Sequence, residues 1–112
     1  MRRPTWFSTW SLTLVAAWCV AASAGGAELA VRSETIGRSL GGEPIRCDLY
    51  GDGDDVLLVI ATIHGNESAG TPLVAEFAKW LRAHPQELAG RTVAIMPVAN
   101  PDAMAKTVRF ND

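Results

Sequence analysis

A continuous apolar run is the feature that most constrains the fold of this chain. Residues 56–61 read VLLVIA, without a polar residue to mark a solvent-facing side. Runs of aliphatic and β-branched residues are typical of a strand buried on both faces, as in a parallel sheet covered by helices. The run therefore predicts an α/β fold in which residues 56–61 form a central strand.

Polar residues follow this strand directly, in the order His64-Gly65-Asn66-Glu67. In open α/β sheets, ligands bind just beyond the carboxyl ends of the strands. A histidine and a glutamate three residues apart at that place can converge on one metal ion, since both are established zinc ligands. We interpret His64 and Glu67 as two-thirds of a zinc site. The alternative is a polar loop histidine beside a carboxylate that the dipole at a helix start favours.

The first residues have the pattern of a secretory signal peptide. Arg2 and Arg3 give a positive start, residues 12–22 are free of charge, and Ala22-Ser23-Ala24 is a small-x-small cleavage site. The apolar stretch is too short for a typical spanning helix, although a membrane anchor is the alternative interpretation. We expect residues 1–24 to be the signal peptide, cleaved at Ala24 or Ala27. We therefore expect an exported protein, periplasmic or secreted, without a stable membrane anchor after cleavage.

Charge and cysteine content exclude some classes of protein. The chain has 10 basic and 12 acidic residues. Removing residues 1–24 takes away two basic residues and no acidic one, which leaves 8 − 12 = −4 and argues against nucleic acid as a partner. After cleavage Cys47 has no second cysteine to pair with, and we expect it to be a small buried hydrophobic residue.

The rest of the chain predicts a β-hairpin followed by a βαβ unit. Residues 31–37 and 45–50 flank Gly41-Gly42, a pair suited to a tight reversal. After Glu67 a helix with one apolar face is expected to continue to Pro85, and residues 92–98 form a second apolar strand. Strand, helix and strand with short connections predict a parallel strand pair. The expected fold class is α/β with a mixed, mainly parallel sheet.

Parallel strands place their carboxyl ends at the same edge of the sheet. The His64 loop and the loop Asn100-Pro101-Asp102 should therefore lie side by side, with Arg109 within reach of both. His84 should not join this site. It lies at the far end of the helix that follows Glu67, about 25 Å away at 1.5 Å per residue.

These motifs, in this order, resemble the zinc carboxypeptidase family, especially its bacterial murein-peptide amidase-like branch. The segment Asn100-Pro101-x-Ala103-Met104 with Arg109 is also similar to the related succinylglutamate desuccinylases and aspartoacylases. The resemblance covers most of the chain after the signal peptide. The matching segments are Ile36-Gly37-Arg38-Ser39, Gly42-Glu43-Pro44-Ile45, IHGNESAG at 63–70 and VANPDAMAKTVRFN at 98–111.

The resemblance implies a zinc-dependent hydrolase. His64 and Glu67 would be zinc ligands, and Arg109 would be a catalytic and substrate-binding residue that polarises the scissile carbonyl and steadies its oxyanion. The implied substrate is a peptide or murein peptide cleaved at an amide bond. An acyl-amino-acid deacylase of the desuccinylase/aspartoacylase type is the alternative.

Two departures from the carboxypeptidase pattern leave these assignments open. Ala103 stands where that branch usually has glycine, which leaves the substrate class undecided. The family's Asp-x-Asn-Arg segment, its third zinc ligand (a His) and its catalytic Glu would lie beyond Asp112. We therefore expect residues 25–112 to be the N-terminal part of a truncated catalytic domain that is inactive by itself. A non-catalytic secreted fragment is the competing interpretation.

Overall fold

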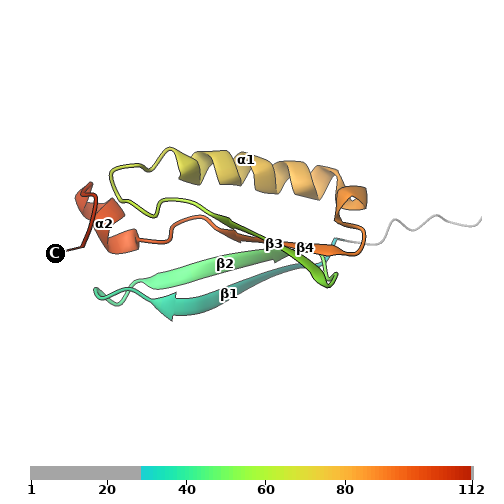
Figure 1. Cartoon of the computed structure of the whole chain (residues 1–112), viewed down its shortest axis with the longest axis horizontal. Coiled ribbons are helices and arrows are strands. Elements are labelled where there is room, and N and C mark those ends of the chain that lie inside the picture. Colours follow the sequence, from blue (N-terminus) through green and yellow to red (C-terminus); the bar gives the residue numbers. More distant parts are fainter. Residues whose placement is uncertain (1–28, 112) are drawn as a thin grey trace, which may run out of the picture.

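A four-stranded sheet forms the centre of the computed structural model, which describes residues 29–111 (Figure 1). The signal peptide predicted for residues 1–24 lies outside the described residues. The strands follow the spatial order β1-β2-β4-β3. Their bounds are Val31–Arg38 for β1, Pro44–Tyr50 for β2, Asp55–Ile60 for β3 and Arg91–Met96 for β4.

Both predicted motifs are present, but the sheet is not mainly parallel. β1 and β2 form the antiparallel hairpin, with an irregularity between Thr35 and Gly37, and β3 and β4 pair in parallel. β2 also pairs with β4, and this pairing is antiparallel. Two of the three strand pairings in the described sheet are therefore antiparallel. The expectation was wrong because β4 lies between the hairpin and β3, so the hairpin joins the parallel pair through an antiparallel contact.

One helical layer covers one face of the sheet (Figure 1). Helix α1 spans Gly70–Ala83, and the short 3-10 helix η1 follows at Pro85–Leu88. The predicted stop at Pro85 is confirmed, because proline cannot continue the hydrogen-bond pattern of a helix. The core lies between α1 and the sheet, and its buried members are Tyr50, Ala61, Val74, Leu81, Leu88, Val93 and Ile95.

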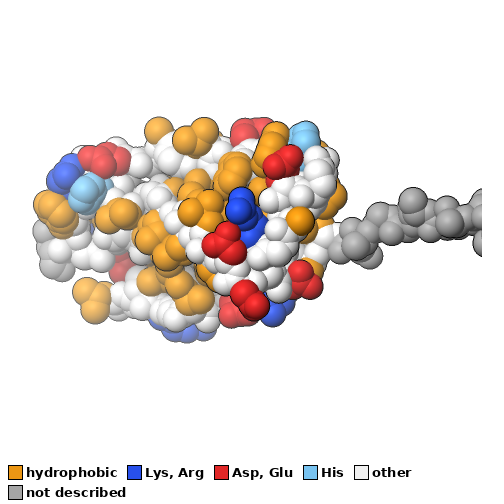
Figure 2. Space-filling view, turned by 45° about the vertical axis from the view of Figure 1, so that its right-hand side comes forward, with side chains coloured by type: hydrophobic (Ala, Val, Ile, Leu, Met, Phe, Trp, Pro, Cys, Tyr) orange, Lys and Arg blue, Asp and Glu red, His pale blue; other side chains and the backbone are white. Residues whose placement is uncertain are grey.

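Strand β3 is not buried on both faces, contrary to the sequence-based expectation. Val56 is 62% exposed, Leu57 and Leu58 are each 53% exposed, and Ile60 is 43% exposed. The strand lies at the edge of the described sheet and has only β4 as a neighbour. An apolar run shows that the side chains are hydrophobic. Whether they are buried depends on the strands and helices that lie beside them. Hydrophobic side chains gather across the middle of the face shown in Figure 2.

A second helix follows β4, in a segment for which the sequence predicted a loop. Helix α2 spans Pro101–Lys106. The Asn100 side chain accepts a hydrogen bond from the Ala103 backbone N–H at 3.1 Å, and Pro101 occupies the first turn. An asparagine cap followed by proline is a helix-start pattern, because the cap satisfies a free N–H and proline has none to satisfy. Ala103 is completely buried.

Cys47 is a free and buried cysteine, as expected. Burial is the main cause that raises the pKa of its thiol, and the nearby carboxylates of Asp48 and Glu34 raise it further. A raised pKa keeps the thiol protonated and unreactive. Within residues 29–111, no helix has both the length and the apolar character needed to cross a membrane.

Candidate active site

Backbone hydrogen bonds join the loops that follow β3 and β4. The Ala99 N–H donates to the Ala61 carbonyl at 3.0 Å, and the Asn100 N–H donates to the Thr62 carbonyl at 3.1 Å. These bonds continue the parallel pairing beyond the ends of the strands. The predicted juxtaposition of the His64 loop and the Asn100 loop is therefore confirmed.

Thr62 and Thr71 fix the start of α1 under this pair of loops. The Thr71 hydroxyl donates to the Pro97 carbonyl at 2.9 Å and lies 2.7 Å from the Thr62 hydroxyl, so Thr62 donates to Thr71. Thr62 is buried and has a φ of +51°, which is unusual for a β-branched residue. Strained backbone of this kind persists where the surrounding structure holds it, and it clusters at functional sites. Here it lies two residues before His64.

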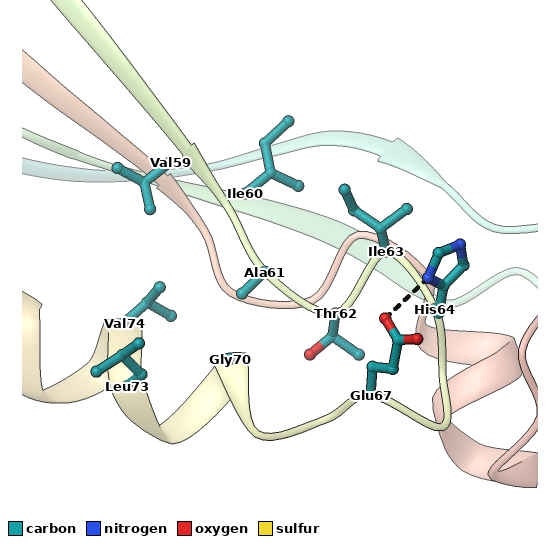
Figure 3. A pocket seen from close by; sticks show the side chains of 10 residues that line it. All are labelled: Val59, Ile60, Ala61, Thr62, Ile63, His64, Glu67, Gly70, Leu73 and Val74. Atoms are coloured by element: carbon teal, nitrogen blue, oxygen red, sulfur yellow. Dashed lines mark hydrogen bonds and ion pairs between the residues drawn. The ribbon is translucent and has the colours of Figure 1, made fainter.

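His64 and Glu67 face one another across a turn (Figure 3). His64 Nδ1 and Glu67 Oε2 are 2.9 Å apart, and the two side chains are 26% and 57% exposed. The Glu67 N–H donates to the His64 carbonyl at 3.1 Å, whereas α1 begins only at Gly70. Glu67 therefore lies in the turn before the helix and not in its first turn. The interpretation of Glu67 as a helix-start carboxylate is wrong.

Arg109 completes the cluster from the far side of α2. Its Nη1 donates to Glu67 Oε1 at 2.6 Å, so both oxygens of this carboxylate have partners. Hydrogen bonding to His64 and then to Arg109 lowers the pKa of Glu67. The carboxylate is consequently ionised at neutral pH, which is the form that binds metals.

Phe110 lies against His64 and Arg109, and it was not among the site residues predicted from the sequence. Its ring packs edge-on against the His64 ring, with the ring centres 5.4 Å apart. The Arg109 guanidinium carbon lies 5.4 Å from the centre of the same phenyl ring. An aromatic ring beside a cation and an imidazole restricts the orientation of both. The position of Phe110 next to Arg109 was the only hint in the sequence.

A cavity of about 430 Å³ adjoins the pair between the end of β3 and the start of α1 (Figure 3). His64 and Glu67 stand at one end of it, and the rest of the lining is mainly apolar. A mainly apolar pocket with a few convergent polar groups is the usual form of a small-molecule site. The other lining residues are Val59, Ile60, Ala61, Thr62, Ile63, Gly70, Leu73 and Val74.

The donor set suits two of the ligands of a zinc ion. A histidine nitrogen and a carboxylate oxygen that face the same space are both common zinc ligands. Within the described residues, no group of three or more histidine, cysteine or acidic residues is arranged to hold a metal. A third protein ligand is therefore not among residues 29–111.

His84 lies away from this site, as predicted. It follows the C-terminal end of α1, which has 14 residues and is therefore about 21 Å long at 1.5 Å per residue. Its Nδ1 lies 2.8 Å from the Trp80 carbonyl, and its ring stacks on the Trp80 ring with centres 4.5 Å apart. Both contacts belong to the end of the helix.

Gly65 connects the site loop to α2. A Cβ atom at this position would lie 2.0 Å from the backbone carbon of Ala103 and 2.2 Å from its oxygen. The approach of the two backbones therefore requires glycine. The position of His64 and Glu67 depends on α2 through this contact.

The structure thus brings His64, Glu67 and Arg109 together at the carboxyl end of a parallel strand pair. The family model of the succinylglutamate desuccinylase/aspartoacylase catalytic domain matches residues 52–112, more than half of the chain. The chain belongs to this family, within the zinc carboxypeptidase-like superfamily that its motifs indicated.

Among solved structures, the chain is similar to a protein from Shewanella amazonensis SB2B described as a "putative metallopeptidase". The two are 29% identical, with a TM-score of 0.60. The match covers 73% of this chain and 31% of that protein, so the chain spans about a third of its length. No curated protein matches the chain.

Proposed function

We propose that the protein containing this chain is a zinc-dependent hydrolase that cleaves an amide bond. The convergence of His64, Glu67 and Arg109 at one strand end carries the proposal. All three lie within the span of the hydrolase family, residues 52–112. Since the chain covers about a third of its structural neighbour, the activity is proposed for a protein in which further residues supply a third ligand and a general base.

His64 and Glu67 would hold the zinc ion. When bound, zinc supplies Lewis acidity, which polarises a carbonyl and lowers the pKa of water toward about 7. The chain prepares this site in two ways. Glu67 is ionised, and the Phe110 ring packs at right angles to the His64 ring and limits its rotation.

Arg109 would bind the carbonyl oxygen of the substrate and offset the negative charge that develops on it. A guanidinium carries five N–H donors, and among the described residues only Nη1 of Arg109 makes a hydrogen bond, to Glu67. The remaining donors are free to meet a substrate. Fixed donors that point at developing charge lower a reaction barrier more than the same groups in water, because they need no reorganisation.

Two substrate classes compete, and each has its own support. The family match favours an N-acyl amino acid. The similarity to a protein described as a metallopeptidase, together with the Asn100-Pro101-Asp102 segment, favours a peptide or murein peptide. We propose that the protein is exported, as residues 1–24 indicate, and a cell-wall peptide suits that location.

The test compares the two histidines of the chain. The complete protein, purified after removal of its signal peptide, is stripped of metal, and zinc content and hydrolysis of both substrate classes are measured after zinc is restored. We expect His64→Ala and Glu67→Gln to lose zinc and hydrolysis, and His84→Ala to keep both. Equal zinc binding by His64→Ala and His84→Ala would contradict the proposed site. The ratio of the two hydrolysis rates identifies the substrate class.

A further inference from the structure

One carboxylate fastens the tip of the β1–β2 hairpin to the start of α2. Asp102 Oδ1 accepts a hydrogen bond from the Ser39 hydroxyl at 2.7 Å, and Oδ2 accepts one from the Gly41 N–H at 2.8 Å. These partners precede Asp102 by 63 and 61 residues. The hairpin tip, residues 39–42, lies outside the strand pairing, because β1 ends at Arg38 and β2 begins at Pro44.

The hairpin tip is closed by its own hydrogen bonds and is therefore held as one unit. The Ser39 hydroxyl accepts the Glu43 N–H at 3.0 Å while it donates to Asp102. The Gly42 N–H donates to the Ser39 carbonyl at 3.0 Å. A Cβ atom on Gly41 would lie 2.7 Å from Asp102 Oδ1, so glycine allows the carboxylate to approach this closely.

A groove of about 460 Å³ runs between the hairpin tip and the loops of the candidate active site. Its largest aliphatic side chains are Leu40, which is 89% exposed, Ile63, which is 57% exposed, and Ile45. Arg38 and Asn100 also line it, and none of its lining residues is acidic. Ile63 also lines the cavity beside His64, so the groove and that cavity adjoin one another at this residue. Figure 3 shows Ile63 pointing away from α1.

We propose that Asp102 is a positioning residue that holds the hairpin tip as one wall of this groove, and that the groove takes an aliphatic group of the substrate. The inference rests on the proposed function for the identity of the ligand as an amide substrate. Leu40 from the hairpin tip and Ile63 from the loop after β3 present large, exposed apolar side chains to the same groove. An aliphatic group lying between them would remove that surface from water. Without Asp102, the tip keeps its internal bonds but loses both bonds to α2.

Hydrogen exchange at position 41 tests the attachment of the hairpin tip. Asp102→Ala should speed exchange of this amide on the order of tenfold. The Gly41 N–H then has no bond to Asp102 that must break before exchange, so local opening costs less free energy. Asp102→Asn keeps one acceptor oxygen and should give an intermediate rate. Glu43→Ala is the matched control, since it removes a carboxylate beside the same tip whose side chain makes no hydrogen bond within the described residues. Unchanged exchange in Asp102→Ala would overturn the proposal.

Ligand binding tests the wall of the groove and needs no hydrolysis. N-acetylleucine amide and N-acetylglycine amide are titrated while the methyl signals of Leu40, Ile45 and Ile63 are followed by NMR. We expect the leucine compound to shift these signals, and Asp102→Ala and Gly41→Ala to weaken it on the order of three- to tenfold. The glycine compound should bind equally to all variants. A leucine compound that binds without shifting these methyl signals, or equally well to Asp102→Ala, would overturn the proposal.

The two measurements also separate this proposal from the proposed function. A wild-type protein that hydrolyses no amide under zinc contradicts the proposed function. Exchange at position 41 and binding of the leucine compound still decide the role of Asp102 in that case.

Discussion

Two carboxylates, Glu67 and Asp102, follow the two parallel strands and have similar electrostatics but different partners. The pKa of each lies below its ordinary value, and in each the two oxygens accept separate hydrogen bonds. The donors to Glu67 are His64 and Arg109, both of which carry or can carry charge. The donors to Asp102 are the hydroxyl of Ser39 and a backbone N–H, which are neutral.

This difference matches the proposed roles, in which Glu67 binds a metal ion and Asp102 positions the hairpin tip. His64 and Arg109 are groups that a metal ion and a substrate oxygen would also engage, so the bonds of Glu67 can be exchanged for others. Ser39 and Gly41 belong to a closed turn, and their bonds to Asp102 hold that turn against α2. A lowered pKa alone therefore does not identify an active-site acid, and the chemistry of the donors does.

The largest expected effect is at Arg109, on the Glu67 side of the comparison. In the complete enzyme Arg109→Ala should lower kcat by roughly 10²–10³-fold, because charge that develops in the transition state loses its donor. KM should change less, and zinc content should stay intact. Arg109→Lys should restore only part of the rate, since a point charge lacks the planar set of donors. A kcat near that of the wild type in Arg109→Ala would remove Arg109 from the site.

The next effect concerns Gly65, which connects the two carboxylate regions through Ala103. Gly65→Ala should reduce the free energy of unfolding by about 1–3 kcal/mol, because the added methyl group forces two backbones apart. Gly37→Ala is the matched control, since a Cβ there meets nothing within 4 Å. Chemical denaturation measures both variants. Equal stabilities would show that the site loop does not depend on α2.

A smaller effect is expected on the acid side of the stability profile. Because the pKa of Asp102 is lowered in the folded state, the unfolded state binds more protons near the ordinary pKa of aspartate, about 3.9. The contribution of Asp102 to the free energy of unfolding is fully present above that pH. It is lost as the pH falls through the lowered pKa of the folded state. In Asp102→Asn, the free energy of unfolding should fall less than in the wild type when the pH is lowered from neutral to the acid range. Urea unfolding at each pH measures this.

The smallest effect is expected when one of the two donors to Asp102 is removed. Ser39→Ala deletes the hydroxyl but leaves the Gly41 N–H in place. The pKa of Asp102 should rise toward its ordinary value without reaching it, since the largest of its lowering causes is lost. An NMR titration of the Asp102 carboxyl carbon measures this. A pKa unchanged by Ser39→Ala would show that the backbone donor alone fixes the carboxylate.

The sequence predicted the parts of the fold that local patterns determine. The hairpin, α1 and the parallel strand pair follow from apolar periodicity, glycine turns and proline stops, and all are present. The meeting of His64, Glu67 and Arg109 followed from one topological rule about parallel strands. Their roles in binding zinc and substrate stay predictions.

The sequence did not predict features that depend on neighbours far along the chain. The insertion of β4 between β2 and β3 has no local signature, because strand order is set by tertiary packing. The bonds from Asp102 to the hairpin tip span more than half of the chain, so no spacing rule could find them. Helix α2 is a local feature that was missed, although Asn100 and Pro101 form a recognisable helix start.

The open edge of β3 has a consequence for the behaviour of the chain in solution. An edge strand presents unpaired N–H and C=O groups along its length, and natural proteins usually protect such edges with charge, proline or a bulge. Here the edge carries Val56, Leu57, Leu58 and Ile60, all well exposed. Such a strand is a template for intermolecular pairing, so the fraction of the isolated chain that stays in solution is expected to fall as its total concentration rises.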